Sequence, residues 1–194
     1  MNLTGDKKME HLQDIQSMNW AVDKAHSKIG FTARHMVISQ VHGQFDSFNV
    51  TAESNGENFE DSKVQVEIDV ASINTGIADR DNHLRSADFF DVEKYPKIYF
   101  KSKSLKVVDE EDFKLIGDLT IKDITKEVEL DVEFGGQVVD PWGNNRVGFR
   151  ISGKVDRFDF DLKWNNLIET GGAVVGKTIK FDCDIELINN DNNK

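Results

Sequence analysis

The side chains best suited to chemistry in this sequence are its five histidines, because imidazole binds metals and transfers protons near neutral pH. A metal site would draw on one of two sets: His26, His35 and His42, or His83 with Asp79 and Asp81. No pair among them has the close spacing of a zinc motif such as HExxH or CxxC. Distant residues can still meet in a folded chain, so spacing alone leaves a metal site open. We interpret these histidines as structural or surface residues and predict no metal site.

A nucleophilic triad can be written from Ser27, His26 and Asp23, which stand almost side by side. Neighbouring residues of an extended strand point to opposite faces, so these three side chains do not converge. The sequence also lacks the G-x-S-x-G motif that exposes a catalytic serine on a sharp turn. We therefore interpret His26 and Ser27 as polar groups of a hairpin, and we predict no catalytic residue.

The remaining reactive candidates are carboxylates and one thiol. With 35 Asp and Glu residues, pairs such as Asp81 with Asp88, or Asp156 with Asp159, are expected by chance and are interpreted as a solvated face. Cys183 lies in an alternating apolar run and has an aspartate on each side. It has no second cysteine to pair with, and we interpret it as a small buried apolar residue. We expect no cofactor.

Length and charge narrow the class of protein further. The 194 residues suffice for one domain, which we assign to 19–194, with 1–18 as a leader or loosely docked segment. The net charge of −11 repels nucleic acid and anionic membrane surfaces, so neither is expected as a partner. No apolar segment is long enough to span a bilayer, so no membrane insertion is expected. The first residues lack the apolar core of a signal peptide, which predicts a cytoplasmic location as written, or a periplasmic or secreted one if a signal was removed.

Apolar and charged residues alternate through most of the chain, as is typical of β-strands with one buried face. The clearest runs are 63–70, 115–121, 128–134, 147–155 and 178–188. A longer strand over 42–51 changes face near Asp46–Ser47, which indicates a bulge. Turns are expected at 109–112, Gly135–Gly136, 141–145 and Gly171–Gly172.

The pattern amounts to about eight strands in an all-β fold, with no stretch long enough for regular βαβ crossovers. The sheet is therefore expected to be mainly antiparallel. Period-two strands occur in both sandwiches and barrels, but glycines inside several strands permit the sharp coiling that barrel closure needs. We favour an up-and-down barrel, which at eight strands is either filled by side chains or holds one small ligand.

One stretch, 78–105, breaks the strand pattern. Its first part, 79–86, is charged and polar, which favours a short helix or ordered loop. Phe89 and Phe90 follow as anchors, and Pro96 biases the preceding residue away from helix, so a strand is expected directly after it.

Three groups of residues resemble one known family, the YceI-like bacterial lipid-binding proteins. The first is carried by Asp79, Leu84, Ser86, Asp88, Phe89, Phe90, Asp91, Val92, Tyr95, Pro96, Ile98, Phe100 and Ser102. The second, similar to the family's opening hairpin, is Trp20, Val22, Asp23, Ala25, His26, Ser27, Ile29, Gly30, Phe31, Arg34, His35, Met36, Val41, Gly43 and Phe45. The third is the closing segment Glu169–Lys180. The resemblance covers Asn19–Ile188 and implies an extended, eight-stranded, lipocalin-like barrel whose apolar lumen holds an isoprenoid or other lipid-like chain.

The alternating pattern also selects the residues expected to face inward. They are Phe31, Phe45, Val66, Ile68, Phe100, Leu119, Leu130, Phe149, Ile151 and Phe181. Chemistry alone favours a filled core, whereas the resemblance implies a hollow one that these residues line. Arg34 is the cation of the opening motif that could meet a polar headgroup, or it could pair with an acidic neighbour outside. Phe89 and Phe90 are expected to plug one barrel mouth.

The expected function is therefore binding, storage or transport of a long apolar isoprenoid-type lipid, without catalysis. Two alternatives stay open. An enzyme, for example a hydrolase or isomerase, could act on an apolar substrate in the same lumen, and this would require a polar cluster inside the barrel. A barrel with a filled core could act by protein contact. A homodimer through exposed strands also stays open.

Overall fold

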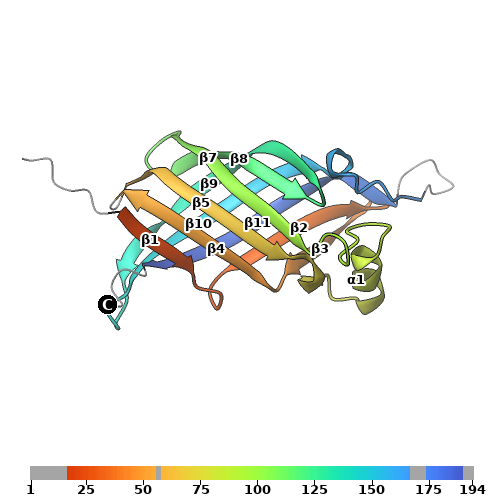
Figure 1. The fold of residues 1–194 in the computed structure, drawn as a ribbon, viewed down its shortest axis with the longest axis horizontal. Helices are drawn as coiled ribbons and strands as arrows, with labels where there is room; N and C mark the ends of the chain where they lie inside the picture. The colour runs from red at the N-terminus through yellow and green to blue at the C-terminus, as the bar shows by residue number, and fades with distance from the viewer. Residues whose placement is uncertain (1–16, 56–57, 167–173, 190–194) are drawn as a thin grey trace, which may run out of the picture.

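The structure, a computed structural model, describes residues 17–55, 58–166 and 174–189. Its elements are β1 (Ser17–Val22), β2 (Lys28–His35), β3 (Ser39–Phe45), β4 (Phe48–Asn55), β5 (Asn58–Asp69), a 3-10 turn (Val70–Ser72), β6 (Ile73–Asn74), α1 (Ala78–Arg85), β7 (Lys97–Val107), β8 (Asp112–Ile121), β9 (Ile124–Val139), β10 (Asn145–Asp156), a second 3-10 turn (Arg157–Phe160) and β11 (Val175–Asn189). The long strands lie obliquely across one elongated body, with α1 at one end (Figure 1).

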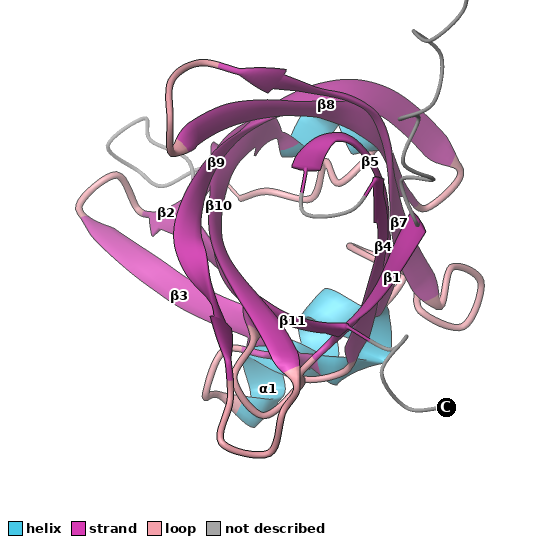
Figure 2. Cartoon of the chain, turned by 90° about the vertical axis from the view of Figure 1, so that its left-hand side faces the viewer, coloured by secondary structure: helices cyan, strands magenta, loops and turns pink. Residues whose placement is uncertain are grey.

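The strands form a closed antiparallel barrel of eight wall positions. The hydrogen-bonded order is β1-β4-β5-β7-β8-β9-β10-β11, and β1 pairs back onto β11. This closing pair joins Trp20 to Asn189 and Val22 to Leu187. Figure 2 shows the strands as a ring seen along the barrel axis. The expected all-β, eight-stranded, antiparallel barrel is thus confirmed.

Two of the eight wall positions are each built from two strands. β1 and β2 both pair antiparallel with β11, one beyond the other, so they run in the same direction along it. β4 pairs with β1, and β3 pairs with β2. The opening motif does contain a hairpin, which is β2–β3. Trp20 and Val22 lie outside it on β1, and His26 and Ser27, interpreted from the sequence as hairpin residues, lie in the connection between β1 and β2, which are not partners.

The predicted long strand 42–51 is also interrupted. It ends as β3 at Phe45 and resumes as β4 at Phe48. Both phenylalanines are buried, although their spacing of three residues would put them on opposite faces of a regular strand. The bend at residues 46–47 resolves this conflict, so the predicted change of face is a break between strands rather than a bulge within one.

The Gly135–Gly136 pair is a bulge and not a turn. β9 continues through both residues, and the register with β10 shifts so that Phe149 faces Phe134 while Gly148 faces Gly136. Gly135 is the extra residue, and Gly136 has a φ of +109° that few other residues adopt. The predicted turns near 109–112 and 141–145 are present, whereas Gly171–Gly172 lies outside the described residues.

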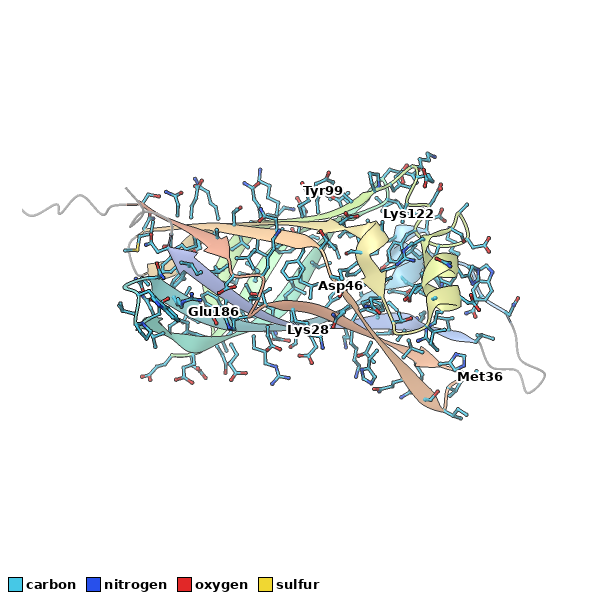
Figure 3. All side chains as sticks on the ribbon, turned by 90° about the horizontal axis from the view of Figure 1, so that it is seen from below. Lys28, Met36, Asp46, Tyr99, Lys122 and Glu186 are labelled. Carbon is cyan, nitrogen blue, oxygen red and sulfur yellow. The ribbon has the colours of Figure 1, made fainter. Side chains whose placement is uncertain are left out.

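The alternation of the strands sets the inside and outside of the barrel. In β7, Ile98 and Phe100 are buried while Tyr99 and Lys101 are exposed, and the same alternation runs through β4. Figure 3 shows Tyr99 at the edge of the body, and Lys28 at the start of β2 is likewise exposed. The apolar faces thus meet in the interior, and charges cover the wall.

The segment after β6 forms the cap at one end of the barrel. As predicted, it contains a short helix, α1, and a strand, β7, that starts directly after Pro96. Arg85 ties α1 to the wall by donating to the carbonyls of Ala71 (2.7 Å) and Ile73 (2.8 Å). The buried carboxylate of Asp81 accepts from the amide and the hydroxyl of Thr75 at 2.9 and 2.5 Å. These bonds fix the cap as an ordered element.

Candidate functional site

The middle of the barrel contains a cavity of about 180 Å³. Ten residues expected to face inward line it: Phe31, Phe45, Val66, Ile68, Phe100, Leu119, Leu130, Phe149, Ile151 and Phe181. The structure thus brings these side chains together on one surface. We refer to this space as the central cavity.

A second cavity, of about 440 Å³, lies at the end of the barrel that carries α1. We call it the cap cavity. Five side chains line both cavities: Phe31, Phe45, Ile98, Ile121 and Phe181. The two spaces are therefore neighbours along the barrel, and this ring of five residues, which we call the waist, stands between them. We refer to the two cavities together as the lumen.

A glycine sets the position of one side chain of the waist. Gly43 lies directly opposite Phe31 in the β2–β3 pair, and the Phe31 ring rests on it. A Cβ at Gly43 would stand 2.3 Å from the Cζ atom of Phe31, closer than van der Waals contact permits. The Phe31 ring also packs on Phe45, with 5.6 Å between centroids. The position of this ring, and hence the width of the waist, depends on the missing side chain at Gly43.

Aromatic residues fill the barrel beyond the central cavity, at the end away from α1. Phe59 packs on Phe149 (5.3 Å between centroids) and on Trp20 (5.6 Å), and Phe134 packs on Phe149 (5.7 Å). The indole of Trp20 is buried and donates to the Ser54 hydroxyl at 2.9 Å. Phe59 lines the central cavity, but sequence reasoning missed it because its neighbours in the chain are polar.

Phe89 and Phe90 both line the cap cavity, where the sequence placed them. Phe89 is buried against Trp164 and His83, at 5.2 Å from each ring. Phe90 makes an edge contact with Phe45 at the waist, with 6.3 Å between centroids. Trp164, which sequence reasoning did not select, completes this aromatic cover.

Polar side chains gather in the cap cavity and are nearly missing from the central one. Arg34, Arg80, His83 and Thr75 line the cap cavity. Arg80 is held in place by bonds to the hydroxyl (2.7 Å) and carbonyl (2.9 Å) of Thr75. The lining of both cavities is thus mainly apolar, and the few polar groups of the lumen lie in the cap cavity.

Arg157 also lines the cap cavity but serves the fold. Its side chain is buried and donates to four main-chain carbonyls, at Leu162, Trp164 (2.9 Å), Val175 (3.2 Å) and Gly176 (3.0 Å). Burial lowers the pKa of this guanidinium. Arg157 thereby fixes the segments on either side of residues 167–173 to the barrel end.

The histidine sets considered for metal binding do not come together. His42 bonds to Thr32 at 3.1 Å, His35 lines the cap cavity, and His26 lies in the β1–β2 turn. Among the described residues, the side chains that approach a metal-binding arrangement are Asp23, His26 and Glu186. The guanidinium of Arg146 already contacts two of them, Asp23 at 2.7 Å and Glu186 at 2.5 Å. The cluster is thus an ion-pair network on the seam between β1, β10 and β11.

The same network shifts the pKa of its members. Hydrogen bonds from His26 and Arg146 lower the pKa of Asp23 to about 2, and the Asp23 carboxylate raises the pKa of His26. Ser27 does not join His26, because its hydroxyl accepts from the amide of Glu186 at 2.9 Å. The nucleophilic triad that could be written from the sequence is therefore not formed. Asp23 and His26 form an ion pair, and Ser27 bonds to the main chain.

Cys183 faces the central cavity from β11. Burial raises the pKa of its thiol to about 11, so the thiol stays protonated at neutral pH. This agrees with the prediction of an apolar rather than a reactive role.

A closed eight-stranded antiparallel barrel with an apolar lumen and a short helix at one end defines the class of lipocalin-like β-barrel proteins. The sequence model of one family, the YceI-like domain, matches residues 20–187. This chain belongs to the YceI-like domain family.

Known relatives agree with this assignment. The chain is 39% identical over 169 residues to UPF0312 protein SA2479 of Staphylococcus aureus, covering 87% of this chain and 96% of the relative. The crystal structure of the Campylobacter jejuni YCEI protein matches with a TM-score of 0.70 and 34% identity over 86% of this chain and 95% of that one. A polyisoprenoid binding domain from Saccharophagus degradans matches at 16% identity with a TM-score of 0.63, over 88% and 98% of the two chains, which shows a shared fold.

Proposed function

We propose that this protein binds a long apolar lipid of the isoprenoid type in its lumen, for storage or transport. The observation that carries the proposal is that two mainly apolar cavities, the central and the cap cavity, adjoin at the waist inside one barrel. Such a shape suits a chain molecule, whose length follows the barrel axis. The polyisoprenoid binding domain of Saccharophagus degradans, which has the same fold, supports this choice of ligand.

An apolar lumen supplies enough binding free energy without specific polar contacts. Burying about 400 Å² of apolar ligand surface contributes about 10 kcal/mol at the usual coefficient. Immobilising a flexible chain offsets several kcal/mol of this gain. Micromolar or tighter binding follows, which explains why the lining needs no recognisable motif.

The ligand's orientation follows from where the polar groups lie. In the proposed complex the apolar tail occupies the central cavity and a polar headgroup stays in the cap cavity near Arg34. A reversed ligand would desolvate its headgroup among apolar side chains, which costs free energy.

We propose binding rather than catalysis for the central cavity. Among its described lining side chains, Ser62 and Cys183 are the polar ones. Ser62 makes no hydrogen bond that would activate its hydroxyl, and the pKa of Cys183 is raised to about 11. Neither group is prepared to act as a nucleophile.

Native mass spectrometry of freshly purified protein, followed by organic extraction, tests the proposal. We expect a bound isoprenoid or similar lipid in the wild type and in the surface variant Glu129→Ala, but not in Phe149→Asp, which puts a carboxylate into the lumen. Circular dichroism checks that the second variant is folded. A wild-type protein that stays free of ligand after incubation with isoprenoid quinones would refute the proposal.

A further inference from the structure

The turn between β2 and β3 exposes three consecutive apolar side chains. Met36, Val37 and Ile38, which we call the hairpin tip, have exposed fractions of 38%, 57% and 88%. Both strands extend past the outline of the ring in Figure 2, and Met36 lies at the cap end in Figure 3. Three adjacent exposed apolar residues are a costly surface for a protein in water.

The backbone of the hairpin tip departs from what its residues prefer. Met36 and Val37 have φ angles of +48° and +69°, in the left-handed region. Glycine and asparagine normally fill such positions, and a β-branched residue there is rare and strained. The tip thus carries large apolar side chains where a strain-free turn would carry small polar ones, and violations of this kind concentrate at functional sites.

The charge of the hairpin differs from that of the rest of the protein. The chain has 35 acidic residues and a net charge of −11, yet residues 24–45 contain no Asp or Glu. The same stretch holds Lys24, Lys28 and Arg34. Charges farther than about 10 Å away are largely screened at ordinary salt. Among the described residues that line the cap cavity, the acidic one is Asp79, on α1, and the aspartates of β11 that pair with β2, Asp182 and Asp184, lie opposite Gly30 and Lys28 at the strand end away from the tip. The hairpin can therefore approach lipid phosphates although the whole protein is acidic.

The base of the hairpin forms part of the lumen. Arg34, His35 and Val41 line the cap cavity, and the Met36 amide donates to the carbonyl of Val174 at 3.0 Å, on the segment that borders this cavity. A surface that holds the hairpin tip would consequently lie next to the polar end of the lumen.

We propose that the hairpin tip enters the headgroup layer of a lipid bilayer and holds the cap cavity against it, so that lipid passes between bilayer and lumen without crossing water. This proposal rests on the proposed lipid-binding function and adds the place where lipid would enter and leave the lumen. Apolar side chains next to a cation, here Arg34 at the base of the tip, are a usual composition of segments that bind at the membrane interface.

A second exposed apolar turn provides a matched control. Trp142, at the β9–β10 turn, is 81% exposed, and Val138 and Val139 are also exposed. This turn carries its own acidic residue, Asp140, whose carboxylate accepts from the Trp142 amide at 2.9 Å. Negative charge at this site opposes contact with lipid phosphates, so we expect this turn to remain in water.

Flotation with phosphatidylcholine vesicles containing some phosphatidylglycerol tests the proposal directly. We expect wild-type protein and Trp142→Asp to float with the vesicles equally. Ile38→Asp should bind at least about tenfold more weakly, because a buried apolar side chain is lost and a repelled charge is gained. Val37→Gly, which removes apolar surface and relieves the backbone, should also weaken binding while raising the thermal midpoint.

Lipid uptake measured without vesicles separates this proposal from the proposed function. Ile38→Asp should take up a dispersed short isoprenoid as well as the wild type does, and should lose only transfer from vesicles. Equal vesicle binding by wild type and Ile38→Asp, or none by the wild type, would overturn membrane docking and leave lipid binding standing. A wild-type dimer that Ile38→Asp converts to monomers, without vesicle binding, would instead assign the tip to contact between two copies. If the wild type binds vesicles but takes up no lipid, the proposed lipid binding in the lumen is refuted and membrane docking stands.

Discussion

The contact between Gly43 and Phe31 allows a test of whether the ligand passes the waist. In Gly43→Ala the new Cβ would stand 2.3 Å from Cζ of Phe31 and less than 3 Å from both Cε atoms, so the ring must move. β2 and β3 block its motion outward, and the ring swings into the junction of the two cavities. Overpacking of this kind costs about 1–3 kcal/mol of stability, which a typical domain tolerates.

The effect on binding should depend on ligand length. In the wild type, each added five-carbon unit that enters the central cavity should contribute about 2–3 kcal/mol after its ordering cost. In Gly43→Ala, a chain that fits within the cap cavity should bind nearly as before. Longer chains should gain nothing further, because they cannot pass the waist.

A series of isoprenoid alcohols of increasing length, titrated by fluorescence displacement, measures this dependence. Gly148→Ala is the matched control, because no atom lies within 4 Å of a Cβ placed there and its φ is not positive. Parallel rise of affinity with length in Gly43→Ala and in the wild type would show that the waist is not on the ligand's path.

Three further predictions concern stability and reactivity. Ser62→Ala should stabilise the ligand-free protein by about 1–3 kcal/mol in urea titrations, because the buried Ser62 hydroxyl has no hydrogen-bond partner. Acid should weaken the seam: the folded pKa of Asp23 is lowered from 3.8 to about 2, so its contribution is complete above pH 4 and is lost as pH falls toward 2. The raised pKa of His26 acts in the opposite direction, since its contribution is complete below the ordinary histidine pKa of 6.5 and is lost as pH rises through the folded pKa. Cys183 should react with iodoacetamide roughly a hundredfold more slowly than a free thiol, since its pKa of about 11 is two units above the usual 9.0.

Each of these predictions has a clear contrary result. Loss of stability in Ser62→Ala would mean that its hydroxyl is bonded in solution. An acid midpoint that stays unchanged when Asp23→Asn is introduced would remove the seam from the pH dependence. Rapid alkylation of Cys183 in the folded protein would show that reagent and solvent reach the lumen freely.

The sequence predicts the barrel wall of this protein well, because apolar and polar residues alternate in a strand that has one face in solvent. Residues such as Phe100 and Ile151 face the lumen as their alternation requires. The alternation alone does not distinguish a barrel from a sandwich, since both folds require the same period of two in each strand. The family motif and the interior glycines decided between them.

The features that the sequence did not predict lie where the alternation of apolar and polar residues is interrupted. The spacing of Phe45 and Phe48 is incompatible with one regular strand, and the structure shows that it marks a break between two strands and not the predicted bulge. Phe59 and Trp164 stand outside alternating runs, so nothing local marks them as interior residues. Arg157 is buried and donates to four carbonyls, two of them five and seven residues along the chain and two on β11, and no residue pattern near it reveals this.

The pairing of β1 with β11 has a consequence for how the chain folds. Barrel closure joins Trp20 to Asn189 through a short seam, so the contact that completes the fold spans nearly the whole described chain. Bringing together residues so far apart in the chain costs loop-closure entropy before the contact stabilises the fold, and folding is slow for this reason. Because β11 also pairs with β2 and β10, three strands wait for it during synthesis. Until it arrives, the apolar inner faces of the other strands stay open, which makes the nascent chain a client for chaperones or for the same lipids that the finished barrel is proposed to hold.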